Sequence, residues 1–93
     1  MSWFTYIVEC ADTTLYTGVT TDIDRRINEH NGGKGSANKG AKYTRVRRPV
    51  RLVYVENIEN RSEACKREAA IKKLSKQHKL KLICEYNLSI QEK

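Results

Sequence analysis

Long apolar runs are the feature that this sequence most clearly lacks. Hydrophobic residues make up 39% of its 93 positions and come in short blocks, none of which approaches the roughly 20 apolar residues of a membrane helix. The apolar block at 3–10 is too short for a secretory signal, and no basic region precedes it. The sequence therefore argues against a membrane protein, and we expect a protein of the cytoplasm.

Paired cysteines are also missing. The three cysteines, Cys10, Cys65 and Cys84, are scattered, odd in number and outside any CxxC pattern. This pattern indicates reduced thiols without a disulfide, and it lacks the ligand spacing of a zinc site. A chain of 93 residues is nevertheless long enough to form one modest core without disulfides or a structural metal. We therefore expect a single domain over residues 1–93.

Acidic residues are absent from one long stretch of the chain. The whole sequence carries 18 Lys and Arg against 11 Asp and Glu, which gives a net charge of +7 and a pI near 9.5. A surface adapted only for solubility would mix charges of both signs. The acid-free segment 31–55 instead predicts contacts with a polyphosphate such as nucleic acid. Its seven basic residues are Lys34, Lys39, Lys42, Arg45, Arg47, Arg48 and Arg51.

Three segments have the composition of β-strands. Residues 3–8 and 15–20 are rich in aromatic and β-branched residues, and the polar break between them predicts an antiparallel hairpin. A third strand is predicted at 51–55, after the sole proline, Pro49. Apolar residues occupy both faces of the first strand, which suits a small sheet covered by helices on more than one side.

Helical patterns fill the spaces between and after these strands. Thr21 as N-cap with an acid at Asp24 predicts a helix that stops before Gly32. The segment 32–49 has the composition of a loop, with one short helical turn near 36–39. Asn60 or Ser62 can cap a helix that runs to about Leu74, and another helix is predicted at 76–86. The fold class is thus α/β (α+β), a small three-stranded antiparallel sheet flanked by helices in the order ββα-loop-βαα.

The first predicted helix has polar residues on the face that should meet the sheet. Its inward stripe is Ile23, Arg26, Ile27 and His30, whereas Arg25 points about 100° away toward solvent. A buried charge without a partner costs several kcal/mol, so Arg26 and His30 must have partners inside the protein. Either they form a structural salt bridge and a satisfied core histidine, or they belong to a functional site.

A carboxylate occupies the corresponding face of the helix that follows the third strand. Glu68 lies in an inward row with Ala64 and Ile71, where it could pair with Arg26 or bind a metal. On the hairpin, Tyr6 and Tyr16 are phenols that need hydrogen-bond partners if buried. Together these residues supply an oxygen ligand for a hard cation, a positive charge and proton-transfer groups, which are the requirements of phosphodiester hydrolysis.

The same residues carry a resemblance to a known family. Phe4-Thr5-Tyr6 and Tyr16-Thr17-Gly18, followed by Arg26, His30 and Glu68, resemble the GIY-YIG endonuclease domain over about residues 2–84, which leaves a short C-terminal tail. The sequence looks closest to the small stand-alone YhbQ-like bacterial members. It shares with them Leu-Tyr-Thr-Gly, Asp-x-x-Arg-Arg, a Gly-Lys-Gly loop, Arg-Pro-Val-Arg-Leu-Val and Arg-Glu-x-x-Ile-Lys.

This resemblance implies a metal-assisted, in-line attack of water on a phosphodiester. A tyrosine would act as the base, directly or through water, and a nearby positive charge would have to lower its pKa from the usual value of about 10. By the resemblance, Arg26 stabilises the transition state, Glu68 holds one Mg²⁺ or Mn²⁺ ion, and Gly18 lets the backbone pack closely. The catalytic residues it implies are Tyr6, which is the expected base, Tyr16, Arg26 and His30, which shares or relays the proton.

Nucleic-acid binding is predicted in the glycine-rich basic segment 32–42. This segment combines cations with backbone amides but lacks the Walker spacing of a P-loop. By the resemblance, relatives with defined substrates add a recognition domain, so we expect selectivity either to come from nucleic-acid shape or a protein partner or to be absent. DNA is expected in preference to RNA. The residues predicted to contact phosphates are Lys34, Lys39, Lys42 and Arg45.

The sequence predicts a metal-dependent DNA endonuclease with a place in DNA repair. A two-metal enzyme is disfavoured because such sites need several convergent carboxylates. The alternative is a non-catalytic nucleic-acid-binding module that retains the same fold. A protein-interaction module leaves the acid-free segment unexplained.

Overall fold

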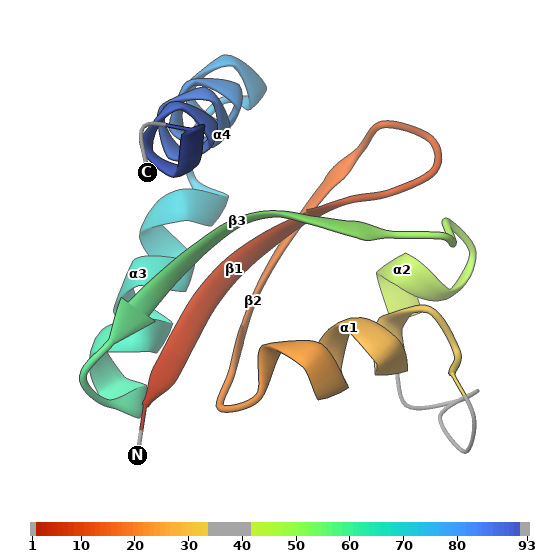
Figure 1. Ribbon diagram of the computed structural model, residues 1–93, viewed down its shortest axis with the longest axis horizontal. Helices are drawn as coiled ribbons and strands as arrows, with labels where there is room; N and C mark the ends of the chain where they lie inside the picture. The colour runs from red at the N-terminus through yellow and green to blue at the C-terminus, as the bar shows by residue number, and fades with distance from the viewer. Residues whose placement is uncertain (1, 34–41, 92–93) are drawn as a thin grey trace.

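A three-stranded antiparallel sheet forms the centre of the protein, whose computed structural model describes residues 2–33 and 42–91 (Figure 1). Its strands are β1 (Trp3–Glu9), β2 (Leu15–Thr20) and β3 (Arg51–Ile58), in the order β2-β1-β3. Both β2 and β3 pair antiparallel with β1. The predicted sheet is therefore confirmed, with β1 as its middle strand.

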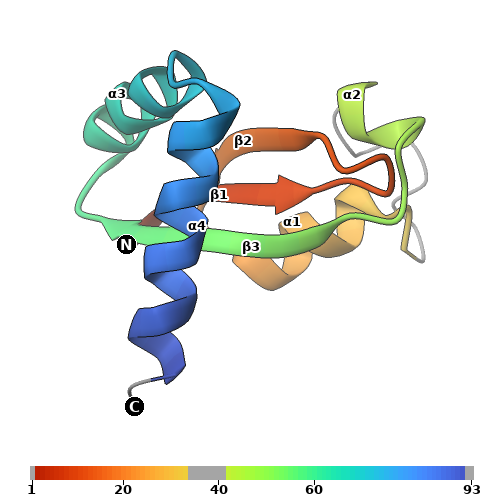
Figure 2. The ribbon, with the colours of Figure 1, turned by 90° about the horizontal axis from the view of Figure 1, so that it is seen from above.

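Helices cover both faces of this sheet. They are α1 (Ile23–His30), α2 (Lys42–Arg45), α3 (Arg61–Lys72) and α4 (Lys76–Gln91). Figures 1 and 2 show α1 on one face of the sheet and α4 across the other, with α3 beside β1 and β2. Across the described part of the chain, each helix is too short or too polar to span a lipid bilayer.

The two faces of β1 belong to two separate apolar cores. Tyr6 and Val8 face α1, where Ile27 packs against them. Ile7 points the opposite way and joins Ile71 of α3, with α4 residues packed around that cluster. Because successive side chains of a strand alternate between faces, one strand can serve both layers. This explains why both faces of the first predicted strand carry apolar residues: each face packs in a different core.

The N-terminal ends of α1 and α3 depend on single side chains. The predicted N-cap Thr21 is wrong, because Asp22 takes that position and accepts a hydrogen bond of 3.1 Å from the backbone N–H of Arg25. A carboxylate one residue later thus satisfies the N–H groups that Thr21 was expected to serve. Of the two candidates for the second cap, Asn60 is confirmed through a bond of 2.9 Å from the N–H of Glu63.

Several element boundaries differ from the predicted ones. β3 continues to Ile58 because Glu56 and Asn57 pair with β1, so cross-strand pairing overrides their weak strand propensity. α3 ends at Lys72 rather than Leu74, and α4 runs to Gln91 because neither glycine nor proline follows position 86 to stop it. The short helix α2 replaces part of the predicted loop, while the helical turn predicted at 36–39 lies outside the described residues.

Candidate active site

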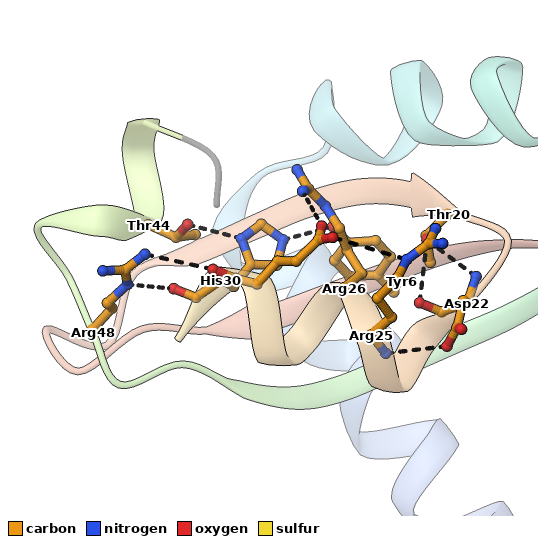
Figure 3. Close-up of polar contacts among 9 residues, drawn as sticks. Tyr6, Thr20, Asp22, Arg25, Arg26, His30, Thr44 and Arg48 are labelled. Atoms are coloured by element: carbon orange, nitrogen blue, oxygen red, sulfur yellow. Dashed lines mark hydrogen bonds and ion pairs between the residues drawn. The ribbon is translucent and has the colours of Figure 1, made fainter. Parts of the chain in front are cut away.

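A buried hydrogen bond between Tyr6 and His30 lies at the centre of the site (Figure 3). The phenol oxygen of Tyr6, in the middle of β1, is 2.7 Å from Nε2 of His30, the last residue of α1. Both residues are almost completely inaccessible, at 1% and 0% exposure. Two polar groups predicted to face the core therefore satisfy each other there.

Burial sets the ionisation of this pair. Desolvation raises the pKa of Tyr6 to about 12, although the nearby Arg26 guanidinium acts in the opposite direction. Desolvation, followed by the positive charge of Arg26, lowers the pKa of His30 to about 4. At neutral pH both groups are uncharged, so the imidazole keeps a lone pair that can accept a proton.

Arg26 lies where α1 approaches the phenol of Tyr6. Its guanidinium forms an ion pair of 2.9 Å with Glu29, and its side chain keeps 25% exposure. The neighbouring Arg25 side chain is 60% exposed, as its predicted position on the solvent side of the helix requires. Arg26 is therefore a cation that is partly desolvated, tied to α1 and still accessible from outside.

Helix α3 brings the Glu68 carboxylate to the same place. Beyond the main effect of burial, the negative charge of Glu68 contributes to the raised pKa of Tyr6. Glu68 forms an ion pair of 3.4 Å with Lys72, whose ammonium lies 5.9 Å from the centre of the Tyr16 ring. That ring meets the His30 imidazole edge-on at 5.4 Å. The structure thus brings together the five side chains that the sequence singled out, which are Tyr6, Tyr16, Arg26, His30 and Glu68.

The sequence left open an ion pair between Arg26 and Glu68, but the structure shows each of them in a different ion pair. Arg26 forms an ion pair with Glu29, and Glu68 forms an ion pair with Lys72. The Glu68 side chain keeps 23% exposure. Its carboxylate is thus held at the edge of the site, where solvent and ligands can reach it.

Thr44 is a site residue that sequence reasoning missed. Its hydroxyl oxygen lies 2.8 Å from Nδ1 of His30, so both ring nitrogens of the imidazole have partners. Thr44 is fully buried in α2, and the adjacent Tyr43 stacks on Tyr16 with a ring separation of 5.9 Å. The four-residue helix is too short to show any periodicity, so the sequence offered no signal for this contact.

The end of α1 is secured to the segment that leads into β3. Arg48 donates a hydrogen bond of 2.6 Å from Nε to the backbone carbonyl of His30. The Asn31 amide makes two bonds to the backbone of Val50, donating at 3.0 Å and accepting at 2.7 Å. Gly32 follows at a φ of +70°, a conformation that favours glycine. These contacts fix the backbone of His30 relative to the sheet.

The predicted phosphate-binding residues are placed only in part. Lys34 and Lys39 lie outside the described residues, and Lys42 begins α2. Arg45 is exposed at the end of that helix. Their role in binding nucleic acid stays a prediction.

The oxygen donors at the site fit one hard cation better than a closed metal centre. In residues 2–33 and 42–91, His, Cys, Asp and Glu side chains form no group of three or more that could hold an ion. Mg²⁺ commonly uses one or two carboxylates and completes its shell with water and substrate phosphates. Glu68, partly exposed and negatively charged, is the residue that would hold Mg²⁺ or Mn²⁺ in this way.

Gly18 lies directly across the ladder from Tyr6. A Cβ atom at this position would come 2.5 Å from the phenol oxygen and 2.7 Å from Cζ, well inside contact distance. We expect Gly18→Ala to displace the Tyr6 ring and to destabilise the protein by about 1–3 kcal/mol, the usual cost of overpacking. Thermal unfolding followed by circular dichroism measures this loss. A melting temperature equal to that of the wild type would show that the ring has room to move.

Comparison with known proteins places this arrangement in a family context. The family of the GIY-YIG catalytic domain matches residues 2–81. A UPF0213 protein of Desulfotalea psychrophila, DP2720, is 62% identical over 82 residues, which are 88% of this chain and 71% of the relative. SSP2268, a UPF0213 protein of Staphylococcus saprophyticus, is 55% identical over 88% of this chain and 94% of its own.

Solved structures show the same relationship. The solution NMR structure of EF2693 from E. faecalis is 42% identical, has a TM-score of 0.62, and aligns over 95% of this chain and 88% of its own. The UPF0213 protein BH0048 from Bacillus halodurans is 45% identical, with a TM-score of 0.55, over 90% of this chain and 84% of its own. The family match spans most of the chain and includes Tyr6, Tyr16, Arg26, His30 and Glu68. This chain belongs to the GIY-YIG family of nuclease domains, among the small UPF0213 proteins of bacteria.

Proposed function

We propose that this protein is a metal-dependent endonuclease that hydrolyses phosphodiester bonds in DNA. The observation that carries the proposal is the buried Tyr6–His30 hydrogen bond, placed between a cation from α1 and a carboxylate from α3. A structural role alone needs neither the partial exposure of Arg26 nor that of Glu68. Both charged groups can meet a phosphate, while His30 stays buried behind the phenol.

The base in this reaction is Tyr6, with His30 as the final proton acceptor inside the protein. Because burial keeps the phenol neutral, Tyr6 can take a proton from the attacking water only while passing its own proton to Nε2 of His30. The water oxygen forms the new bond to phosphorus, and the bond from phosphorus to the leaving oxygen breaks, with the leaving oxygen taking a proton from solvent. His30 later returns the proton to solvent.

Arg26 and Glu68 supply the electrostatic part of catalysis. The Arg26 guanidinium offers a planar set of donors to the negative charge that grows on the phosphate oxygens. Glu68 would hold the divalent cation, which when bound polarises the phosphate and stabilises the leaving oxygen. Lys72 pairs with Glu68 in this structure and would be available to the phosphate if the carboxylate held a cation instead.

The nature of the substrate rests on charge and on the family. The acid-free segment 31–55 supports contacts with a phosphate backbone, and such contacts carry little sequence information. We propose DNA rather than RNA as substrate and DNA repair in the cytoplasm as the setting, with nucleic-acid shape or a protein partner giving selectivity. The three unpaired cysteines suit a reducing compartment.

The experiment that tests this function is cleavage of a panel of labelled nucleic acids. The panel contains single-stranded, duplex, nicked and branched DNA and RNA, each incubated with Mg²⁺, Mn²⁺ or EDTA. We expect cleavage of at least one DNA form that requires the divalent cation and ceases in EDTA. Cleavage that continues in EDTA, or that is confined to RNA, would contradict the proposal.

A second function is favoured by two features of the site. The Glu68 carboxylate is paired with the Lys72 ammonium, and burial raises the pKa of the Tyr6 phenol to about 12. Both features suit a nucleic-acid-binding module that keeps the fold without catalysis. Salt-dependent binding without cleavage across the whole panel would select this alternative, because phosphate contacts release counterions whether or not a bond is broken.

A further inference from the structure

The hydrogen bonds around His30 form a chain that runs in one direction. The phenol of Tyr6 carries one hydrogen and is only 1% exposed, so this hydrogen must be donated inside the protein. The phenol hydrogen then needs an acceptor, and Nε2 of His30 lies 2.7 Å away. On the other side of the ring, Nδ1 lies 2.8 Å from the Thr44 hydroxyl oxygen. The chain therefore passes through both nitrogens of one imidazole.

This direction determines which nitrogen of the neutral imidazole carries the hydrogen. If Nε2 accepts from the phenol, Nδ1 must be protonated and must donate to Thr44. The reverse arrangement would place a hydrogen on Nε2 and turn the buried phenol hydrogen away from it. A buried donor without a partner costs about 1–3 kcal/mol.

We propose that Thr44 is a positioning residue that holds His30 in the tautomer with hydrogen on Nδ1 and an open lone pair on Nε2. Its consequence for catalysis rests on the proposed function, since that lone pair is what accepts the Tyr6 proton. When the proton arrives, the hydroxyl oxygen of Thr44 continues to accept from Nδ1 and stabilises the imidazolium. The tautomer itself exists independently of any substrate.

Helix α2 is docked in a way that keeps Thr44 in this position. Tyr43 is stacked on Tyr16 on one side and has the Arg47 guanidinium 4.0 Å above its ring. Arg47 also donates from its backbone N–H to the carbonyl of Thr44 at 3.0 Å. Its side chain reaches the Asp12 carboxylate at 3.1 Å, in the turn between β1 and β2. Contacts made by Tyr43 and Arg47 thus hold α2 against the hairpin, with the Thr44 hydroxyl at the imidazole.

Nuclear magnetic resonance tests the tautomer directly in the wild-type protein. Two-bond nitrogen–proton correlations of a nitrogen-15-labelled sample at neutral pH distinguish a protonated ring nitrogen from an unprotonated one. We expect His30 to show a protonated Nδ1 and an unprotonated Nε2, whereas the exposed His78, whose Nδ1 lies 3.0 Å from the Ser75 hydroxyl oxygen, serves as a solvent-accessible internal reference. A protonated Nε2 in His30 would overturn the proposal whether or not the protein cleaves nucleic acid.

Two substitutions connect the tautomer with activity. Thr44→Val keeps the shape of the side chain but removes the acceptor, and we expect a shift toward the Nε2-protonated form with a roughly ten- to a hundredfold lower kcat at unchanged KM. Thr44→Ser keeps the hydroxyl and should retain the tautomer and most of the activity. An unchanged tautomer in a folded Thr44→Val protein would contradict the proposal, as would equal losses in both variants.

Discussion

Replacing Glu68 with glutamine is expected to lower metal-dependent cleavage by about a thousandfold or more. Glutamine keeps the size of the side chain but removes the negative charge that a hard cation requires. Loss of several kcal/mol of charge stabilisation in the transition state corresponds to this factor, since about 1.4 kcal/mol is tenfold in rate. Single-turnover cleavage of the best substrate in Mg²⁺ and in Mn²⁺ measures the effect.

Glu63→Gln is the matched control for this variant. Glu63 lies in the same helix, makes a similar ion pair of 3.4 Å with Lys66, and has a side chain that is 56% exposed. Both variants lose one negative charge, so their nucleic-acid binding in EDTA should change equally and slightly. If the two variants cleave at the same rate, Glu68 does not hold the cation.

Replacing Arg26 with alanine is expected to reduce kcat by about a hundred- to a thousandfold. Removal of one preorganised donor to the developing charge of a transition state typically costs about 2.7–4 kcal/mol. The cost is large here because the guanidinium is partly desolvated and its charge acts on the Tyr6 phenol. Arg26→Lys should recover only part of the rate, because an ammonium lacks the planar fork of donors.

Arg25→Ala provides the control for this second prediction. The two arginines are adjacent and both approach Glu29, but the Arg25 side chain points to solvent with 60% exposure. Losing either charge should weaken binding to DNA by a similar, salt-sensitive amount. An Arg25→Ala protein that loses as much kcat as Arg26→Ala would indicate a general effect of charge rather than a role at the reacting phosphate.

The sequence was sufficient for the sheet and for the polar stripe of α1 because both depend on local periodicity. Arg26 and His30 recur with the apolar residues of that helix, and this spacing alone places them on its inner face. Periodicity did not decide which of two cations pairs with Glu68. Lys72 lies one turn along the same helix, and the choice between it and Arg26 is decided by the tertiary placement of α3.

The contacts made by the short helix α2 could not be predicted. Thr44 reaches His30 only because α2 stacks on β2 and is tied to the hairpin turn through Arg47. No repeat of two or of three to four residues marks that docking. A single domain over residues 1–93 stays a prediction, as do the roles given to the individual site residues.

The position of β1 ties chemistry to cooperative folding. This strand contributes Tyr6 to one core and Ile7 to the other, while the charged groups beside Tyr6 come from helices in different layers. Neither layer can open without separating one of these groups from the phenol. The site therefore has no partly folded version that retains function, and natural variation that loosens either core is exposed to selection on activity as well as on stability.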